Sequence, residues 1–305
     1  MRFIKFPSIE NTYNSKELAW VITNTPVAAE WVATEKLHGS NFSFNIDKSG
    51  EVKLASRNGF TDEGFFGYGS SEDYAVMVEK VKNMAKIMLP DNIEDDAQLT
   101  LFGELVGPKI QKGVYYGDDK RFYAFKLVIS TDDRVCVFDY DSFKDWCWEF
   151  GIPTAPLRGR GTLQEMLNLP NEFDSVITGK PNNVAEGLVI EPVVAIKVQE
   201  SYVMLKNKND KFKENSRVPK EPKSIPEVDS ELIFKLKELV NPNRIDSAIS
   251  KLGLDITLMS DYINEVRRDV FKEMDIEFNK EAHGSLFGKV SKDIVTHVKQ
   301  RLSEV

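Results

Sequence analysis

The stretch Glu35–Phe42 constrains the fold and the chemistry of this chain more than any other. Apolar residues alternate with polar ones on both sides of it: Trp31 and Ala33 before it, then Phe42, Phe44 and Ile46. This period of two predicts two half-buried strands joined by a tight turn, with Lys36 at the end of the first strand and Gly39 in the turn. Flanking strands would aim the lysine amine, and glycine lets backbone approach an anion, so the stretch suits attack on a phosphate.

The composition fits a soluble globular chain with one large and one small domain. The chain has 305 residues, of which 41% are hydrophobic and 29% are charged. Its first residues contain no apolar run of the secretory type, and no window reaches the ~18 apolar residues of a membrane helix. We therefore expect a cytoplasmic protein with no membrane partner.

The cysteines, the histidines and the net charge argue against a disulfide-rich protein, a zinc protein and a nonspecific nucleic-acid-coating protein. Cys136 and Cys147 are too few for a disulfide framework and are expected to be reduced, and the three histidines form no zinc-spaced cluster. The net charge of −8 argues against a chain that coats nucleic acid unspecifically. A local basic face is still expected, because residues 206–223 contain seven Lys or Arg against three Asp or Glu.

Short alternating runs predict an α+β domain over residues 1–218. Further strands are expected near 52–59, 98–107, 122–129, 183–191 and 202–208, with a hairpin at 134–138. Helices are expected near 15–22, 71–88, 139–149 and 162–169. The glycine-rich loop at 60–69 carries Phe65 and Phe66, which either fold onto the core or are covered by a partner.

Most of the expected strands carry a residue that could face a shared pocket: Arg57, Glu104, Phe125, Glu186, Lys206 and Lys208. Glu104 lies among apolar residues and needs hydrogen-bond donors nearby. Strand alternation places Phe125 opposite the core-facing Phe122 and puts the two lysines on one face. A solvated edge strand is the alternative explanation of the paired lysines.

The rest of the chain predicts a linker and a helical domain. Residues 219–228 are charged and contain three prolines, which is typical of a linker. Residues 229–305 predict a small all-α domain, with helices at 229–241, 243–253, 256–273 and 285–303. Asn243 is the expected cap of the second helix and Gly253 its expected stop.

The order of these residues resembles the covalent nucleotidyltransferase superfamily of ligases and RNA capping enzymes, and its details resemble the bacteriophage RNA ligase 2 family. The segments that carry the resemblance are Glu35–Phe42, Arg57–Gly59, Phe65–Tyr68, Phe102–Glu104, Ile110–Lys112, Phe122–Phe125, Glu186–Val189 and Lys206–Lys208. Asn243–Ile245 and Ile249–Gly253 extend it into the tail. It implies a nucleotidyltransferase domain of mainly antiparallel sheets flanked by helices.

The resemblance implies an ATP-dependent RNA ligase. Such an enzyme joins a 3′-hydroxyl to a 5′-phosphate, here at nicks in duplex RNA, through a lysyl-AMP and an RNA-adenylate. Its cofactors would be ATP and Mg²⁺, with Mn²⁺ as a substitute. Its partner would be nicked duplex RNA or an RNA/DNA hybrid, its oligomeric state a monomer, and its location the host cytoplasm if a phage encodes it.

The resemblance also implies roles for individual residues. Lys36 would be the nucleophile, and Lys206 and Lys208 would offset phosphate charge and favour its neutral amine. Adenosine would contact Glu35, Leu37, Phe125, Glu104 and Arg57, and the α-phosphate would contact Asn41. Glu186 would position Mg²⁺, and the RNA ends would contact Ser40, Arg57, Phe65 and Phe66.

Two departures from the family pattern are expected to compensate each other. Glu191 stands where a lysine is usual, and Lys126 stands where an acid is usual. If the two are neighbours, the charges have changed places. Two alternatives to an RNA ligase are a DNA ligase or capping guanylyltransferase, which usually append a β-barrel instead of helices, and a non-catalytic RNA-binding homologue.

Overall fold

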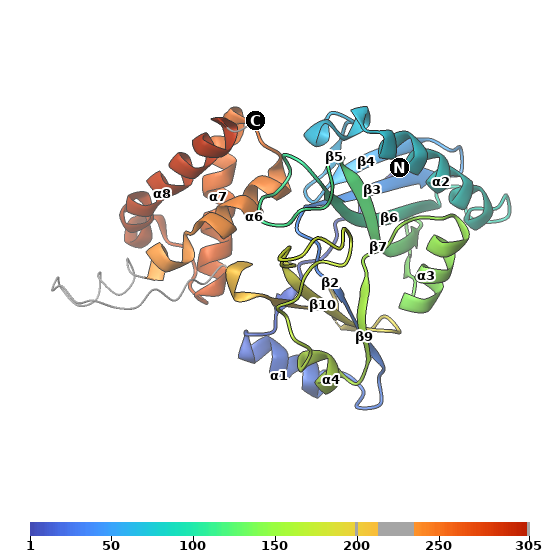
Figure 1. The fold of residues 1–305 in the computed structure, drawn as a ribbon, viewed down its shortest axis with the longest axis horizontal. Coiled ribbons are helices and arrows are strands. Elements are labelled where there is room, and N and C mark those ends of the chain that lie inside the picture. Colours follow the sequence, from blue (N-terminus) through green and yellow to red (C-terminus); the bar gives the residue numbers. More distant parts are fainter. Residues whose placement is uncertain (199–200, 213–234, 304–305) are drawn as a thin grey trace. The chain divides into compact units, whose positions relative to one another are not determined.

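The computed structural model describes residues 1–198, 201–212 and 235–303, and the chain divides into two compact units, Met1–Asn209 and Asp210–Val305 (Figure 1). Each unit has a hydrophobic core of its own. The expected linker, 219–228, lies outside the described residues, so the proposed domain boundaries stay predictions.

A six-stranded antiparallel sheet forms one half of the first unit. Its strand order is β5 (Phe60–Thr61), β4 (Val52–Ser56), β3 (Ser40–Asp47), β6 (Gln98–Val106), β7 (Arg121–Ser130) and β8 (Val135–Val137). Helices α2 (Glu72–Met88) and α3 (Tyr140–Glu149) lie beside this sheet and contribute to its largest core (Figure 1). Ser71 caps α2 and Asp139 caps α3, each through its side chain.

A second, five-stranded sheet forms the other half of this unit. Its order is β1 (Glu10–Asn11), β13 (Leu205–Lys208), β10 (Gly187–Pro192), β2 (Trp31–Glu35) and β9 (Leu157–Gly161), and only β1 and β13 are parallel. Helices α1 (Ser15–Asn24) and α4 (Leu163–Leu167) pack on its core, and β11 (Lys197–Val198) pairs with β12 (Ser201–Tyr202). The prediction of an α+β domain with mainly antiparallel sheets is confirmed.

Lys36 follows the end of β2, as predicted, but the prediction of a tight turn that joins this strand to the next is wrong. Strand β2 belongs to the five-stranded sheet and β3 to the six-stranded sheet, so residues 36–39 cross from one sheet to the other. Strand β2 is also buried along its whole length. Gly39 is needed for close approach and not for a turn, because a Cβ there would lie 2.1 Å from the carbonyl oxygen of Leu105.

Strand β7 contains a β-bulge at Phe125. Phe102 of β6 pairs with Lys126 and Gly103 pairs with Ala124, so Phe125 has no partner on β6. The expected alternation holds as far as Phe125, and beyond the bulge the phase changes, so that Leu127 joins the core. Phe125 therefore faces away from that core, and it packs with a separate cluster around Phe6.

The second unit is helical within its described residues. Its described helices are residues 235–239, α6 (Pro242–Leu252), α7 (Met259–Glu273) and α8 (Lys280–Ser303), with short 3-10 turns at Asp210–Phe212 and Ile256–Leu258. Asn241, and not Asn243, caps α6, because its side chain accepts the Arg244 N–H at 3.1 Å and Pro242 takes the first helical position. Gly253 ends α6 as expected. No helix in the described parts of the chain is both long and apolar enough to span a membrane.

The two departures from the family pattern, Lys126 and Glu191, form a buried ion pair between β7 and β10. Their side chains are 7% and 8% exposed. The two sheets are therefore joined by a charge pair, and the condition for an exchange of charges, that the two residues are neighbours, is met.

Exchanging the two charges should restore stability that either single change removes. Lys126→Glu or Glu191→Lys alone buries two like charges, and each should lower the free energy of unfolding by about 3 kcal/mol or more. The double variant Lys126→Glu/Glu191→Lys should recover most of that loss in urea titrations. The exposed pair Lys53 and Glu51 is the control, and its exchange should change stability by less than about 0.5 kcal/mol. A double variant that is no more stable than the less stable of the two single variants would refute the pairing.

Candidate active site

Lys36 follows directly after β2 and is held from both ends. Its backbone N–H donates to the carbonyl oxygen of Gly187 at 2.8 Å. Its ammonium lies 2.8 Å from Oε2 of Glu186, and its side chain is 19% exposed. The amine is therefore fixed at the junction of the two sheets and remains open to a ligand.

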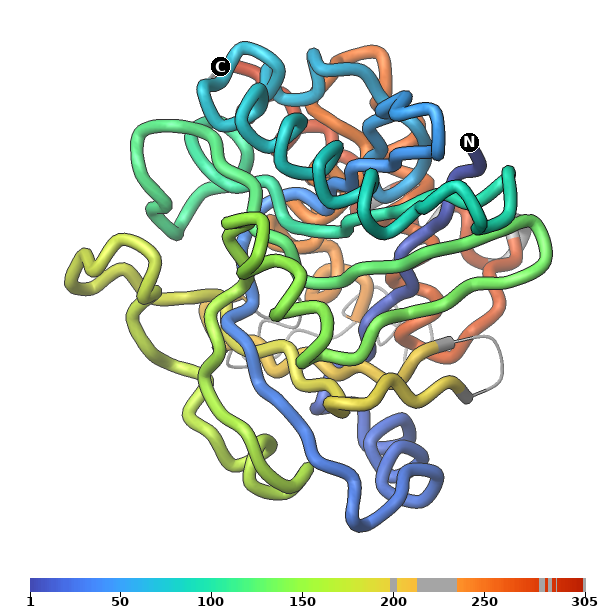
Figure 2. Tube along the Cα trace, turned by 90° about the vertical axis from the view of Figure 1, so that its right-hand side faces the viewer, coloured from blue at the N-terminus to red at the C-terminus, as the bar shows by residue number. Residues whose placement is uncertain are grey.

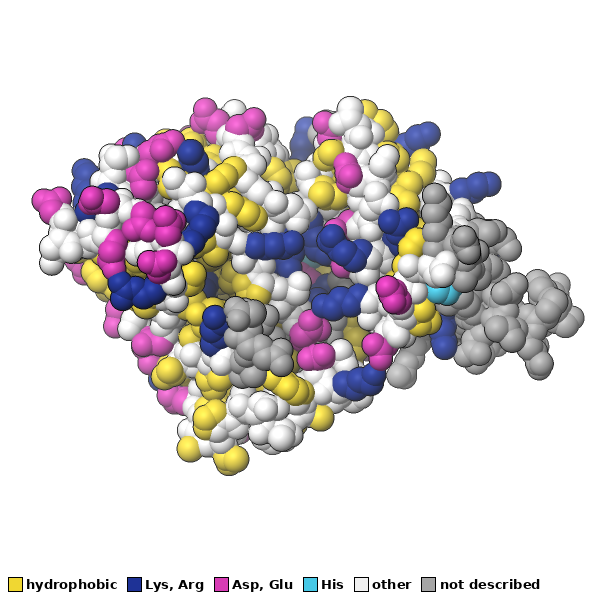
Figure 3. Space-filling model, turned by 180° about the vertical axis from the view of Figure 1, so that it is seen from behind, with side chains coloured by type: hydrophobic (Ala, Val, Ile, Leu, Met, Phe, Trp, Pro, Cys, Tyr) yellow, Lys and Arg dark blue, Asp and Glu magenta, His cyan; other side chains and the backbone are white. Residues whose placement is uncertain are grey.

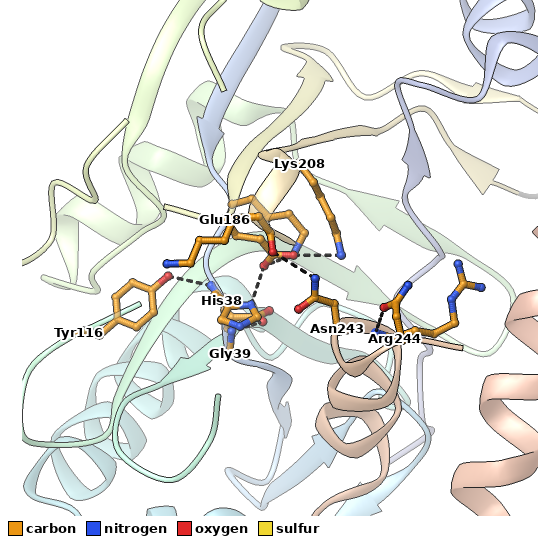
Figure 4. A network of polar contacts seen from close by, with 11 residues as sticks. His38, Gly39, Tyr116, Glu186, Lys208, Asn243 and Arg244 are labelled. Carbon is orange, nitrogen blue, oxygen red and sulfur yellow. Dashed lines mark hydrogen bonds and ion pairs between the residues drawn. The ribbon is translucent and has the colours of Figure 1, made fainter. Parts of the chain in front are cut away.

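Glu186 is the centre of the polar network. Its Oε2 also lies 3.1 Å from Nδ1 of His38, and its Oε1 lies 3.1 Å from Nζ of Lys208. Figure 4 shows His38 and Lys208 directed at this carboxylate. Burial alone would raise the pKa of Glu186, but the charges of Lys36 and Lys208 and the hydrogen bond from His38 hold this pKa well below its usual value.

His38 and Tyr116 are two members of this network that the sequence analysis missed. The backbone N–H of His38 donates to the hydroxyl of Tyr116 at 2.8 Å (Figure 4). Tyr116 is 3% exposed, and burial raises its pKa well above the usual value. The place of His38 two residues after Lys36 is a signal that could have found it. Nothing in the sequence marks Tyr116, which arrives from a distant loop.

Glu104 lies beside the same network at the end of β6. Its Oε1 accepts the backbone N–H of Gly39 at 3.1 Å, and it pairs across the sheet with Asn41 on β3. Burial raises the pKa of Glu104 to about 7; Lys36 opposes this change and the charge of Glu186 adds to it. The expected donors for this buried acid are therefore present.

Glu104→Gln should change how stability depends on pH. Below pH 4.5 the carboxyl group is protonated in both states, whereas between 4.5 and about 7 the unfolded chain ionises first, which favours unfolding. Because Glu104 keeps some solvent access, the cost above pH 7 is at most about 3 kcal/mol. In urea titrations, the free energy of unfolding of the variant relative to wild type should rise from pH 4.5 to pH 8. Exposed Glu79→Gln is the control and should show no such rise. The same difference between Glu104→Gln and wild type at pH 4.5 and at pH 8 would contradict the assignment.

Glu35 and Leu37 flank the lysine and are both buried. Oε2 of Glu35 accepts the N–H of Val176 at 3.2 Å, whereas Oε1 is buried with no hydrogen-bond partner. Burial also raises the pKa of Glu35. A buried oxygen without a donor is costly, so this position suits a ligand group that carries an N–H. The amino group of adenine has that chemistry.

Phe125 and Arg57 are each contacted by residues near the start of the chain. The Phe125 ring is partly buried, with its centroid 4.9 Å from that of Phe6. Nη2 of Arg57 donates to Oγ of Ser8 at 3.0 Å. Arg57 also lies near enough to Glu104 to lower its pKa, so it belongs to the same neighbourhood.

Lys206 lies opposite Val189 on β10, and Lys208 lies opposite Gly187. Alternation along β13 puts both lysines on one face, and Lys208 is buried against Glu186. The paired lysines therefore do not form a solvated edge, because β13 has a neighbour on each side.

The residues expected at the RNA ends lie in two settings. Phe65 and Phe66 are partly buried and pack on the core near Phe42, and Phe66 has a positive φ of 50° that is uncommon for a bulky residue. Ser40 is fully buried at the start of β3. Their contacts with RNA stay predictions.

The buried carboxylate of Glu186 is the group best placed to bind a divalent cation. No group of three or more His, Cys, Asp or Glu that could hold a metal exists among the residues with defined positions. Mg²⁺ commonly uses one or two carboxylates and takes its other ligands from phosphates and water, so Glu186 with Glu104 nearby fits that ion. Figure 3 shows Lys and Arg side chains interspersed with Asp and Glu on one face of the molecule.

A lysine at the junction of two mainly antiparallel sheets, beside two acids and a second lysine, is the arrangement of a covalent nucleotidyltransferase. The chain belongs to the RNA ligase family, whose model matches residues 29–208. A second model, of the T4 RNA ligase 2 C-terminal domain, matches residues 223–304. The resemblance inferred from the sequence is confirmed.

Known relatives support the same assignment. The chain is 27% identical to the mitochondrial RNA-editing ligase 1 of Trypanosoma brucei brucei over 54% of this chain and 45% of that protein. Two solved structures of Naegleria gruberi RNA ligase variants, one with AMP and Mn and one with ATP and Mn, share its fold, with TM-scores of 0.52 and 0.51. Both are 17% identical and match over 70% of this chain and 58% of theirs. The chain thus spans about half the length of these relatives.

Proposed function

We propose that this protein is an ATP-dependent RNA ligase that joins 3′-hydroxyl and 5′-phosphate RNA ends at nicks in duplex RNA. One observation carries the proposal: the ammonium of Lys36 lies 2.8 Å from Glu186, whose other oxygen pairs with Lys208. A nucleophile, an acid and a second cation therefore share one buried centre. Membership of the RNA ligase family supports RNA as the substrate.

The first step of this reaction would form a lysyl-AMP. The neutral amine of Lys36 attacks the α-phosphorus of ATP, the bond to pyrophosphate breaks, and the amine proton leaves. The ion pair with Glu186 holds the Lys36 nitrogen at 2.8 Å, so this contact must loosen before the attack. Lys208 is placed to offset negative charge that develops on the phosphate.

The adenosine site would be assembled from both sheets. Phe125 would stack on the base, where such contacts are worth about 1–3 kcal/mol. The unpartnered Oε1 of Glu35 would accept a hydrogen bond from the adenine amino group. Glu104 and Arg57 would bind the ribose hydroxyls, and Asn41 lies across from Glu104 for the α-phosphate.

A divalent cation, Mg²⁺ or Mn²⁺, would be held by Glu186 together with the ATP phosphates. It would supply positive charge beside the α-phosphate. The Naegleria structures with Mn support this choice of chemistry. In the second and third steps, AMP passes to the RNA 5′-phosphate and the 3′-hydroxyl then displaces it, while Phe65 and Phe66 contact the ends.

The test is nick sealing with matched substrates. Purified protein with Mg²⁺ receives a nicked RNA duplex, an RNA/DNA hybrid, a nicked DNA duplex or single-stranded RNA, with ATP or GTP. The proposal predicts that ATP supports sealing of the RNA nick best. Sealing of nicked DNA alone would identify a DNA ligase, labelling by GTP a capping enzyme, and RNA binding without any labelled protein a non-catalytic homologue.

A further inference from the structure

We infer that residues 6–12 are a support segment for the nucleotide site, in which Phe6 and Ser8 act as positioning residues for Phe125 and Arg57. The inference rests on the proposed function, since Phe125 and Arg57 bind a nucleotide only if the protein uses one.

Phe6 supports the Phe125 ring from one side. It is 4% exposed, and its ring centroid lies 4.9 Å from that of Phe125 at an interplanar angle of 63° and 5.2 Å from that of Phe102. Phe125 sits in the β-bulge, where it has no partner on β6. The edge contact from Phe6 therefore restricts the ring at a position where the sheet pairing is interrupted.

Ser8 holds the guanidinium of Arg57. Its Oγ accepts a hydrogen bond from Nη2 at 3.0 Å. A guanidinium group has five N–H donors in a fixed plane, so this bond restricts its orientation through one of them. Arg57 follows β4, a strand of the six-stranded sheet, and its contact with Ser8 links that sheet to the support segment.

The end of the support segment pairs with the strand that carries Lys206. Glu10 and Asn11 form β1, which lies parallel to β13, and the N–H of Thr12 donates to the carbonyl oxygen of Lys206 at 3.0 Å. Figure 2 shows the chain near its N-terminus, in dark blue, running from the strands of one sheet to those of the other. Within seven consecutive residues, Phe6, Ser8 and residues 10–12 thus contact three residues proposed to bind the nucleotide or lie on a strand that carries one: Phe125, Arg57 and Lys206.

This placement predicts an effect on binding and not on chemistry. A ring or guanidinium held in its bound orientation loses less conformational freedom when the ligand arrives. Removal of Phe6 should therefore weaken the contribution of the base to binding, whereas the attack by Lys36 should proceed at its former rate once ATP is bound.

The experiment measures self-adenylylation against ATP concentration for wild type, Phe6→Ala, Phe6→Leu, Ser8→Ala and the control Phe3→Ala. Phe3 packs edge-on against Phe60 at 5.8 Å, outside the nucleotide site. Ribose 5-triphosphate, which lacks a base, is the competing inhibitor. Circular dichroism and thermal unfolding confirm that each variant is folded.

Phe6→Ala should raise KM, the ATP concentration that gives half the maximal labelling rate, by about fivefold, which is part of the binding energy of a base stack. The maximal labelling rate should stay within about twofold, and the inhibition constant of ribose 5-triphosphate should be unchanged. Phe6→Leu, which keeps the apolar volume, should raise KM by about twofold. Ser8→Ala should raise KM by about threefold for ATP and less for 2′-deoxy-ATP. Phe3→Ala should change neither constant.

Three results would overturn the inference alone. In the first, wild type is labelled and Phe6→Ala has the same KM for ATP as wild type; if Phe6→Ala does not fold, Phe6→Leu is compared instead. The second is equal weakening of ATP and ribose 5-triphosphate binding, and the third is the same KM change in Phe3→Ala; either would show a general folding role. A wild type that forms no covalent label would overturn the proposed function together with the inference.

Discussion

Lys36→Ala should abolish covalent labelling of the protein by α-labelled ATP. Lys36 contacts the Glu186 carboxylate at the junction of the two sheets and is 19% exposed, whereas Lys208, which contacts the same carboxylate, is only 9% exposed. The variant should still seal an RNA nick whose 5′ end already carries AMP, because that step needs no lysyl-AMP. Labelling is read by denaturing electrophoresis, and sealing by the length of the RNA product.

The control for this change is Lys86→Ala on the exposed face of α2. It removes a lysine of the same kind and should label like wild type. Two outcomes would contradict the assignment: label retained on Lys36→Ala, or failure of that folded variant on both ATP and pre-adenylylated RNA. The second outcome would mean that Lys36 serves binding throughout and is not a nucleophile.

Glu186→Gln should lower the rate of self-adenylylation by at least about 100-fold. The change removes the charge that Lys36, Lys208 and His38 share and keeps the shape of the side chain. It also removes the carboxylate proposed to hold the divalent cation, so raising the Mg²⁺ or Mn²⁺ concentration should not restore the rate. Exposed Glu149→Gln on α3 is the control and should keep full activity.

The same variant has a defined pH signature. Since the pKa of Glu186 is well below 4.5 in the folded state, its ion pairs stabilise the protein above pH 4.5, and this stability is lost as pH falls through the folded pKa. Wild type should therefore lose more free energy of unfolding than Glu186→Gln when urea titrations move from pH 6 to pH 3. Equal losses would show that this carboxylate is not held by the two lysines.

The sequence predicted the strands and the site residues that depend on local pattern. Alternation identified β3, β6 and β7, and the apolar neighbours of Glu104 correctly required donors for a buried acid. The helical spacing of 71–88 correctly predicted α2, and the glycine at 253 correctly predicted the end of α6. Each of these features rests on residues close together in the chain.

Features that depend on distant contacts could not be predicted. The period of two is the same whether β2 and β3 share one sheet or lie in two, so the crossover at Lys36 was missed. A bulge adds one residue without a sequence mark, which hid the phase change after Phe125. Tyr116 and Phe6 reach the site from a loop and from the start of the chain, and no spacing relates them to Lys36.

The most direct test of the central claim is peptide mapping by mass spectrometry. Wild-type protein is incubated with ATP and Mg²⁺, digested without exposure to acid, which would break the phosphoramide, and fragmented. The account predicts one AMP on the peptide that contains Lys36, attached to its side-chain nitrogen. AMP on Lys206, Lys208 or any other residue, with the Lys36 peptide unmodified, would contradict it.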